Sequence, residues 1–162
     1  MSPTDSESTD TPWLSDAEQC AWRTYLDASK LITHQMEKDL QPFGLTNNDY
    51  EILVNLSESA EKRMRMSDLA TVTLQSKSRL SHQITRMENA GLVRRENCES
   101  DRRGLYAVLT EEGGAVMHKV APYHVASVRR HFIDLIKPEE LIRMSTILKP
   151  VTEDLRGKRG KI

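Results

Sequence analysis

The sequence predicts a mainly α-helical protein in which one charged β-hairpin interrupts a series of helices. Three observations predict this fold class. Apolar residues recur at spacings of three and four along most of the 162 residues, as on one face of an α-helix. A short helical segment, a tight turn and a second helical segment occupy residues 66–90, the order of a helix-turn-helix. Two extended stretches follow before residue 110 and complete a winged helix-turn-helix with a small β-hairpin wing.

The N-terminal part of the chain predicts a tail and one long helix. Residues 1–12 carry no apolar side chain beyond Met and Pro, so we expect a disordered tail. A helix is expected over residues 16–40, and Pro42 and Gly44 end it. One face of that helix is apolar and is formed by Ala21, Tyr25, Ala28, Ile32 and Met36.

The central part predicts three further helices. Thr46 is a plausible N-cap, with Asp49 three residues later in a near capping box. Residues 58–65 are polar and are expected to be a connection without regular structure. Ser67 is expected to cap a short helix over residues 68–73, and a second helix is expected over residues 77–90, ended by Gly91.

The C-terminal part predicts a hairpin and two helices. Residues 92–93 and 105–109 read as strands, with the hydrophilic residues 94–104 between them. Thr110 is expected to cap a helix that runs to about Ile136 and bends at Pro122. Pro138 then starts a last helix, followed by a basic tail over residues 157–162. That helix carries an apolar seam suited to another helix, formed by Leu141, Met144, Leu148, Val151 and Leu155.

Composition excludes several classes of protein. No apolar run approaches the roughly 18 residues of a membrane span, and the polar, acidic N-terminus is not a signal peptide. Cys20 and Cys98 form no CxxC pair, which suits a reducing cytoplasm. No phosphate-binding Gly loop, carboxylate pair or ordered Ser/His/Asp motif is present, so we expect neither an enzyme nor a cofactor. The five histidines lack ligand spacing, and no metal site is expected.

The charges are distributed unevenly along the chain. The net charge is −1, yet residues 61–104 hold ten Lys and Arg against six Asp and Glu. No acidic residue occurs from Leu69 through Met87. A basic segment inside an acidic protein is a local electrostatic feature that would not repel a polyanion.

The helix over residues 77–90 separates its side chains into two faces. Leu80, Ile84 and Met87 form the inward face. The outer face and the preceding turn carry groups that reach base edges or phosphates. The predicted DNA contacts there are Gln75, Ser76, Lys77, Ser78, Arg79, Ser81, His82 and Arg86. An ordinary solvated face is the alternative interpretation.

The hairpin adds four arginines, and an Arg on a thin β-wing can enter the minor groove. The predicted contacts in the wing are Arg94, Arg95, Arg102 and Arg103, and Asp101 is expected to orient a neighbouring Arg. Alternatively, Arg94 and Arg95 pair with Glu96 or Glu99 at the surface.

Four stretches of residues 20–155 resemble the multiple-antibiotic-resistance regulator (MarR) family. They are LTNNDYEILVNL (45–56), MSDLA (66–70), SKSRLSHQITRMENAGLVRRE (76–96) and SDRRGLYAVLTEEG (100–113). The resemblance implies a homodimeric regulator, usually a repressor, which binds a pseudo-palindromic operator on double-stranded DNA in the cytoplasm, associated with the nucleoid. It also implies that residues 76–89 form the recognition helix and that Arg103 enters the minor groove. Residues 13–44 and 111–156 would then be dimerisation helices around a DNA-binding domain over residues 45–110.

The resemblance further implies release of DNA by a small aromatic or phenolic effector, bound between the dimerisation helices and the winged domain. The candidate effector residues are Trp22, Tyr25, Met36, Tyr50 and His118. For Trp22 and Tyr25 the alternative is a place in the core. Two other functions stay open at this point: a redox-sensing regulator that uses Cys20, and a winged helix that binds a protein instead of DNA.

Overall fold

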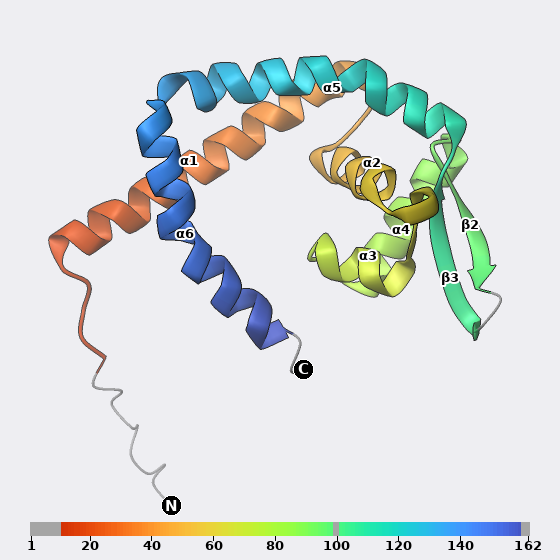
Figure 1. Ribbon diagram of the computed structural model, residues 1–162, viewed down its shortest axis with the longest axis horizontal. Helices are drawn as coiled ribbons and strands as arrows, with labels where there is room; N and C mark the ends of the chain where they lie inside the picture. The colour runs from red at the N-terminus through yellow and green to blue at the C-terminus, as the bar shows by residue number, and fades with distance from the viewer. Residues whose placement is uncertain (1–10, 99–100, 160–162) are drawn as a thin grey trace, which may run out of the picture.

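The computed structural model describes residues 11–98 and 101–159, with the side chains of 101–103 and 159 left out, and shows a helical protein with one small sheet (Figure 1). The sheet is antiparallel with strand order β1-β3-β2. The expected winged helix-turn-helix is confirmed: α3 and α4 form the helix-turn-helix, and β2 and β3 form the wing. The elements are α1 (Asp16–Leu40), α2 (Asn47–Glu58), β1 (Arg63–Arg65), α3 (Met66–Val72), α4 (Lys77–Asn89), β2 (Val93–Cys98), β3 (Asp101–Leu109), α5 (Glu111–His131) and α6 (Pro138–Arg159).

Side-chain caps explain where most helices begin. Thr46 and Asp49 form a complete capping box, because Thr46 Oγ1 accepts from the Asp49 N–H at 3.1 Å and an Asp49 carboxylate oxygen accepts from the Thr46 N–H at 2.9 Å. Ser76 caps α4, and Thr110 caps α5 by accepting from the Gly113 N–H. Gly91 follows α4 with a φ of 76°, a left-handed conformation that glycine adopts without strain.

Four sequence expectations were wrong at element boundaries. Residues 94–98 and 101–104 belong to β2 and β3, where a hydrophilic turn was expected, because charged side chains are tolerated on a hairpin that extends away from the core. Residues 63–65 form β1, where a connection was expected, and pair with β3 in the register Arg63↔Val108 and Arg65↔Tyr106. A strand of three residues is too short for an alternating pattern, so only the long-range pairing reveals it. Ser67 is not a cap, because α3 already begins at Met66. Helix α5 ends at His131, before the expected Ile136, and a 3₁₀ turn over Ile133–Leu135 follows.

The core lies in the winged domain. Ile52, Leu53 and Leu56 of α2 are completely buried, and so are Leu80 and Ile84 of α4. Further core side chains come from α1, α3, the sheet and α5, which contribute Leu40, Leu69, Val93, Ala107, Leu109 and Val120. Helix α4 therefore rests on one apolar face and leaves its other face outside.

The three long helices expose apolar side chains outside this core. Helices α1 and α5 lie side by side, while α6 turns back from the end of α5 (Figure 1). Along the predicted seam of α6, Val151 and Leu155 remain more than half exposed. Other large exposed apolar side chains on these segments are Trp22, Tyr25, Leu31, Val125, Leu135, Ile142 and Ile147. Within the described ranges, no helix has both the length and the apolarity that a membrane crossing requires.

Gly113 and Gly114 provide a matched test of how closely α5 packs on the wing. A Cβ on Gly113 would lie 2.0 Å from the Leu92 carbonyl oxygen, whereas one on Gly114 would meet nothing within 4 Å. We therefore expect Gly113→Ala to lower the free energy of unfolding by about 1–3 kcal/mol, as overpacking does. Gly114→Ala should raise it by about 0.5–1 kcal/mol. Urea denaturation at equal protein concentration measures both, and equal stabilities would contradict the close approach.

Candidate nucleic-acid interface

The outer face of α4 is exposed and carries positive charge. Its inner side chains, Leu80, Ile84 and Met87, are buried. Lys77, Arg79 and His82 are exposed, and their side chains make no hydrogen bond or ion pair with another described residue. Ser78 and Ser81 are exposed beside them. This face thus offers unengaged donors over about two helical turns, with no carboxylate among them.

The turn before α4 holds two predicted contacts in different situations. Ser76 is exposed, and its hydroxyl is engaged in capping α4 and in a 3.3 Å hydrogen bond with the Ser78 hydroxyl. Gln75 is half-buried, and its amide nitrogen is buried with no hydrogen-bond partner among the described residues. Gln75 therefore does not stand on the exposed face with Arg79 and His82.

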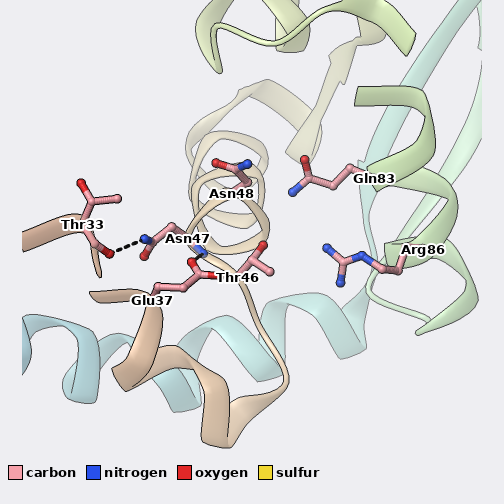
Figure 2. A pocket seen from close by; sticks show the side chains of 7 residues that line it. All are labelled: Thr33, Glu37, Thr46, Asn47, Asn48, Gln83 and Arg86. Carbon is pink, nitrogen blue, oxygen red and sulfur yellow. Dashed lines mark hydrogen bonds between the residues drawn. The ribbon is translucent and has the colours of Figure 1, made fainter. Parts of the chain in front are cut away.

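Arg86 lies on a flank of α4 and is paired. Its guanidinium donates to the carboxylate of Asp49, which is completely buried at the start of α2, and Gln83 Nε2 donates to the same carboxylate oxygen at 3.0 Å. Burial raises the pKa of Asp49, but the hydrogen bonds from Arg86, the Thr46 N–H and Gln83 together lower it below its ordinary value. The carboxylate is therefore charged at neutral pH. Figure 2 shows Gln83 and Arg86 pointing from α4 toward the residues that begin α2.

The two wing arginines nearest α4 are also engaged within the chain. Arg95 donates through its guanidinium to Glu88 at 2.6 Å, to the Ser81 carbonyl at 2.8 Å and to the Thr85 hydroxyl at 3.0 Å. It thereby fastens β2 to α4. Arg94 pairs with Glu96, one of the two surface pairings anticipated for it. For Arg95 the acidic partner is Glu88, and not Glu96 or Glu99, the pairing considered as the alternative to DNA contact.

The tip of the wing is described in part. The side chains of Asp101, Arg102 and Arg103 lie outside the described residues, so their predicted roles stay predictions. Cys98, which precedes the tip, is buried, and its Sγ accepts from the Arg65 guanidinium at 3.3 Å. Cys20 is exposed on α1.

The five predicted effector residues do not meet in one place. Trp22 and Tyr25 stack on each other at 6.0 Å and are half exposed on α1, so they are not core residues in this chain. Met36 is buried under α5, where the Ser127 hydroxyl reaches its sulfur at 3.5 Å. Tyr50 packs against His124, and His118 is exposed on α5. The sequence pattern placed them on one face of each helix but could not show which faces meet.

Two cavities are lined by residues other than the five predicted effector residues. One of about 370 Å³ lies between the end of α1 and α5 and has an aromatic pair, Phe43 and Tyr123, with ring centres 5.1 Å apart. Lys38 and Arg130 add two cations to its lining. The other, of about 440 Å³, is polar and is lined by Thr33, Glu37, Thr46, Asn47, Asn48, Gln83 and Arg86 (Figure 2). Sequence reasoning missed both cavities, because each joins residues that are far apart along the chain. In the described part of the chain, no three His, Cys, Asp or Glu side chains are grouped to hold a metal ion.

Comparisons with known proteins agree with this geometry. A family model described as MarR family matches residues 43–104. The crystal structure of AbsC, a MarR family transcriptional regulator from Streptomyces coelicolor, is 76% identical, with a TM-score of 0.87 over 91% of this chain and 99% of that chain. Sco3205 from the same organism, solved in complex with DNA, is 40% identical, with a TM-score of 0.87 over 91% of this chain and 93% of that one. The HTH-type transcriptional regulator PecS of Dickeya dadantii (strain 3937) is 29% identical over 81% of this chain and 79% of its own length.

Proposed function

Because the chain belongs to the MarR family of transcriptional regulators, we propose that it is a homodimer that binds a pseudo-palindromic DNA operator and represses transcription. The exposed, acid-free face of α4 is the observation that carries this proposal. The DNA complex of the 40% identical Sco3205 supports it. A two-fold dimer presents two recognition helices, so we expect half-sites about one helical turn apart.

The uncovered apolar side chains support the homodimer. Val151 and Leu155 of α6, Leu31 of α1 and Leu135 beyond α5 are each more than half exposed in the single chain. A second copy of the chain would remove this surface from water, and apolar area of this kind is the usual driving force for permanent association.

The predicted site residues divide into those that would contact DNA and those that form ion pairs within the chain. Arg79 and His82 are our candidates for base readout, and Lys77, Ser78 and Ser81 for contacts to phosphates. Arg103 and Arg102 would reach the minor groove from the wing, with Asp101 orienting one of them. Arg86, Arg94 and Arg95 were expected among the contacts, but each forms an ion pair within the chain, which favours a structural role for them.

Arg79→Ala tests the readout. Once operators have been selected from genomic DNA fragments, we expect this variant to lose about 1–3 kcal/mol of discrimination at one base position, provided that Arg79 contacts a guanine. Binding titrations against single-base operator variants measure this loss. A uniform loss on every sequence would instead make Arg79 a phosphate contact. No salt-dependent binding to any duplex at low salt would favour a protein-binding winged helix.

We further propose that a small aromatic acid releases the protein from DNA by binding at the cavity between α1 and α5. Phe43 and Tyr123 would hold the ring, and Lys38 or Arg130 the carboxylate. Such an effector must bind the DNA-free conformation more tightly, so operator DNA should weaken its affinity by the same factor by which it weakens DNA binding. Salicylate is a suitable first probe for calorimetry with and without operator. Equal affinity in both states would contradict release through this cavity.

A further inference from the structure

We propose that Asp49 is a positioning residue for DNA recognition: its buried carboxylate sets the rotation of α4 relative to α2, and the preference for operator over other DNA depends on it. This inference rests on the proposed DNA-binding function. Asp49 cannot touch DNA itself, because its side chain is completely buried. Any effect that it has on DNA recognition must therefore pass through α4.

The two oxygens of this carboxylate serve different helices. Oδ2 accepts from the Thr46 N–H at 2.9 Å and closes the capping box at the start of α2. Oδ1 accepts from Gln83 Nε2 at 3.0 Å and from the Arg86 guanidinium, both on α4. One rigid group thus joins the first turn of α2 to the second half of the recognition helix.

The apolar contacts of α4 do not determine its rotation as sharply. Leu80, Ile84 and Met87 hold the helix by burial, which is non-directional. Hydrogen bonds weaken steeply when donor and acceptor are misaligned, so they oppose a roll about the helix axis. The polar link to Asp49 is therefore better suited than the apolar contacts to fix how α4 faces outward.

The two α4 residues that bond to Asp49 are neighbours of the two residues proposed to contact bases. Arg79 and Gln83 are four residues apart, as are His82 and Arg86, so each pair shares a side of the helix. At 3.6 residues per turn, the contacts of Arg95 with Ser81, Thr85 and Glu88 lie on the opposite flank of α4. The outer face of α4 lies between these two polar attachments. Loosening the Asp49 attachment would turn Arg79 and His82 away from their groove positions.

The test compares Asp49→Asn with Thr46→Ala. Both variants weaken the capping box of α2, but only the first removes the charge that holds Arg86. The measurement is the affinity of the full-length dimer for a selected operator and for an unrelated duplex at one salt concentration. We expect Asp49→Asn to reduce the ratio of the two affinities about tenfold, and Thr46→Ala to leave it within about twofold. Thermal unfolding and sedimentation confirm that each variant is a folded dimer.

Arg86→Gln provides an independent arm, because Arg86 is at the surface and its replacement should fold even if Asp49→Asn does not. We expect Arg86→Gln to lower the same ratio, and the double variant to lower it no further than the larger single effect. Additive losses, or equal losses on operator and unrelated DNA, would make Arg86 a plain phosphate contact and overturn the inference. Full discrimination by a folded Asp49→Asn dimer would also overturn it. The two failures are distinguishable by the wild-type protein. If the wild-type protein bound no DNA, the proposed function would fail. If it preferred the operator and the Asp49→Asn dimer kept that preference, only this inference would fail.

Discussion

Raising the salt concentration from 50 to 200 mM is expected to weaken operator binding about 10³- to 10⁵-fold, the loss typical of proteins that neutralise six to ten phosphates. The whole chain has a net charge of −1 and would not attract DNA on average. Attraction must come from the local surface of α4 and the wing, where Lys77 and Arg79 have no carboxylate partner among the described residues. Each Lys or Arg that meets a phosphate releases a condensed counterion, and salt opposes that release.

Fluorescence anisotropy across a salt series measures this dependence as the slope of log affinity against log salt. Lys77→Gln should reduce the slope by about two in the dimer, one contact for each protomer. Lys149→Gln is the matched control, because Lys149 is an exposed lysine on α6, outside the helix-turn-helix and its wing, and should leave the slope unchanged. A flat salt response of the wild-type protein would contradict DNA binding through this surface.

Replacing Val151 and Leu155 by Glu is expected to separate the protomers and to lower operator affinity about 10²- to 10⁴-fold. Both side chains are more than half exposed, and they lie four residues apart on the predicted seam of α6. A carboxylate at each position would have to be desolvated in a helix–helix contact, which opposes association. In a dimer, binding of the first half-site makes binding of the second intramolecular, which raises the affinity for the whole operator by this factor. A monomer does not have this gain in affinity.

Thr146→Glu with Gly157→Glu is the matched control for this variant. It adds the same charge to α6 on the side away from the seam, and a side chain at Gly157 meets nothing within 4 Å. Sedimentation and operator titration of both double variants would separate the effect of charge from the effect of the seam. A Val151→Glu/Leu155→Glu protein that remained a dimer with full affinity would exclude this face of α6 as the dimer contact.

Local signals made the fold predictable in most of its elements. The caps at Thr46 and Thr110 and the stop at Gly91 act over three or four residues, so they are visible in sequence and were recovered in the structure. The strand β1 escaped detection because its single central apolar residue, Met64, forms no pattern without its partner β3.

Side-chain partners across the chain were less predictable. Arg79, Arg86 and Arg95 have the same chemistry and similar positions in the basic segment, yet only Arg79 is unpaired among the described residues. Arg86 and Arg95 differ from it because their partners, Asp49 and Glu88, come within reach only when α2, α4 and β2 pack together.

The sequence by itself determined the order of the helices, the basic wing and the outward face of the recognition helix, because periodicity, capping and charge act between near neighbours. Only the tertiary structure decided which charged groups remain available and which ones hold the helix in place. It also decided where the cavities lie, since each is bounded by residues that the fold brings together from distant parts of the chain. Hydrogen bonds and ion pairs depend on distances of a few ångströms, and packing sets those distances.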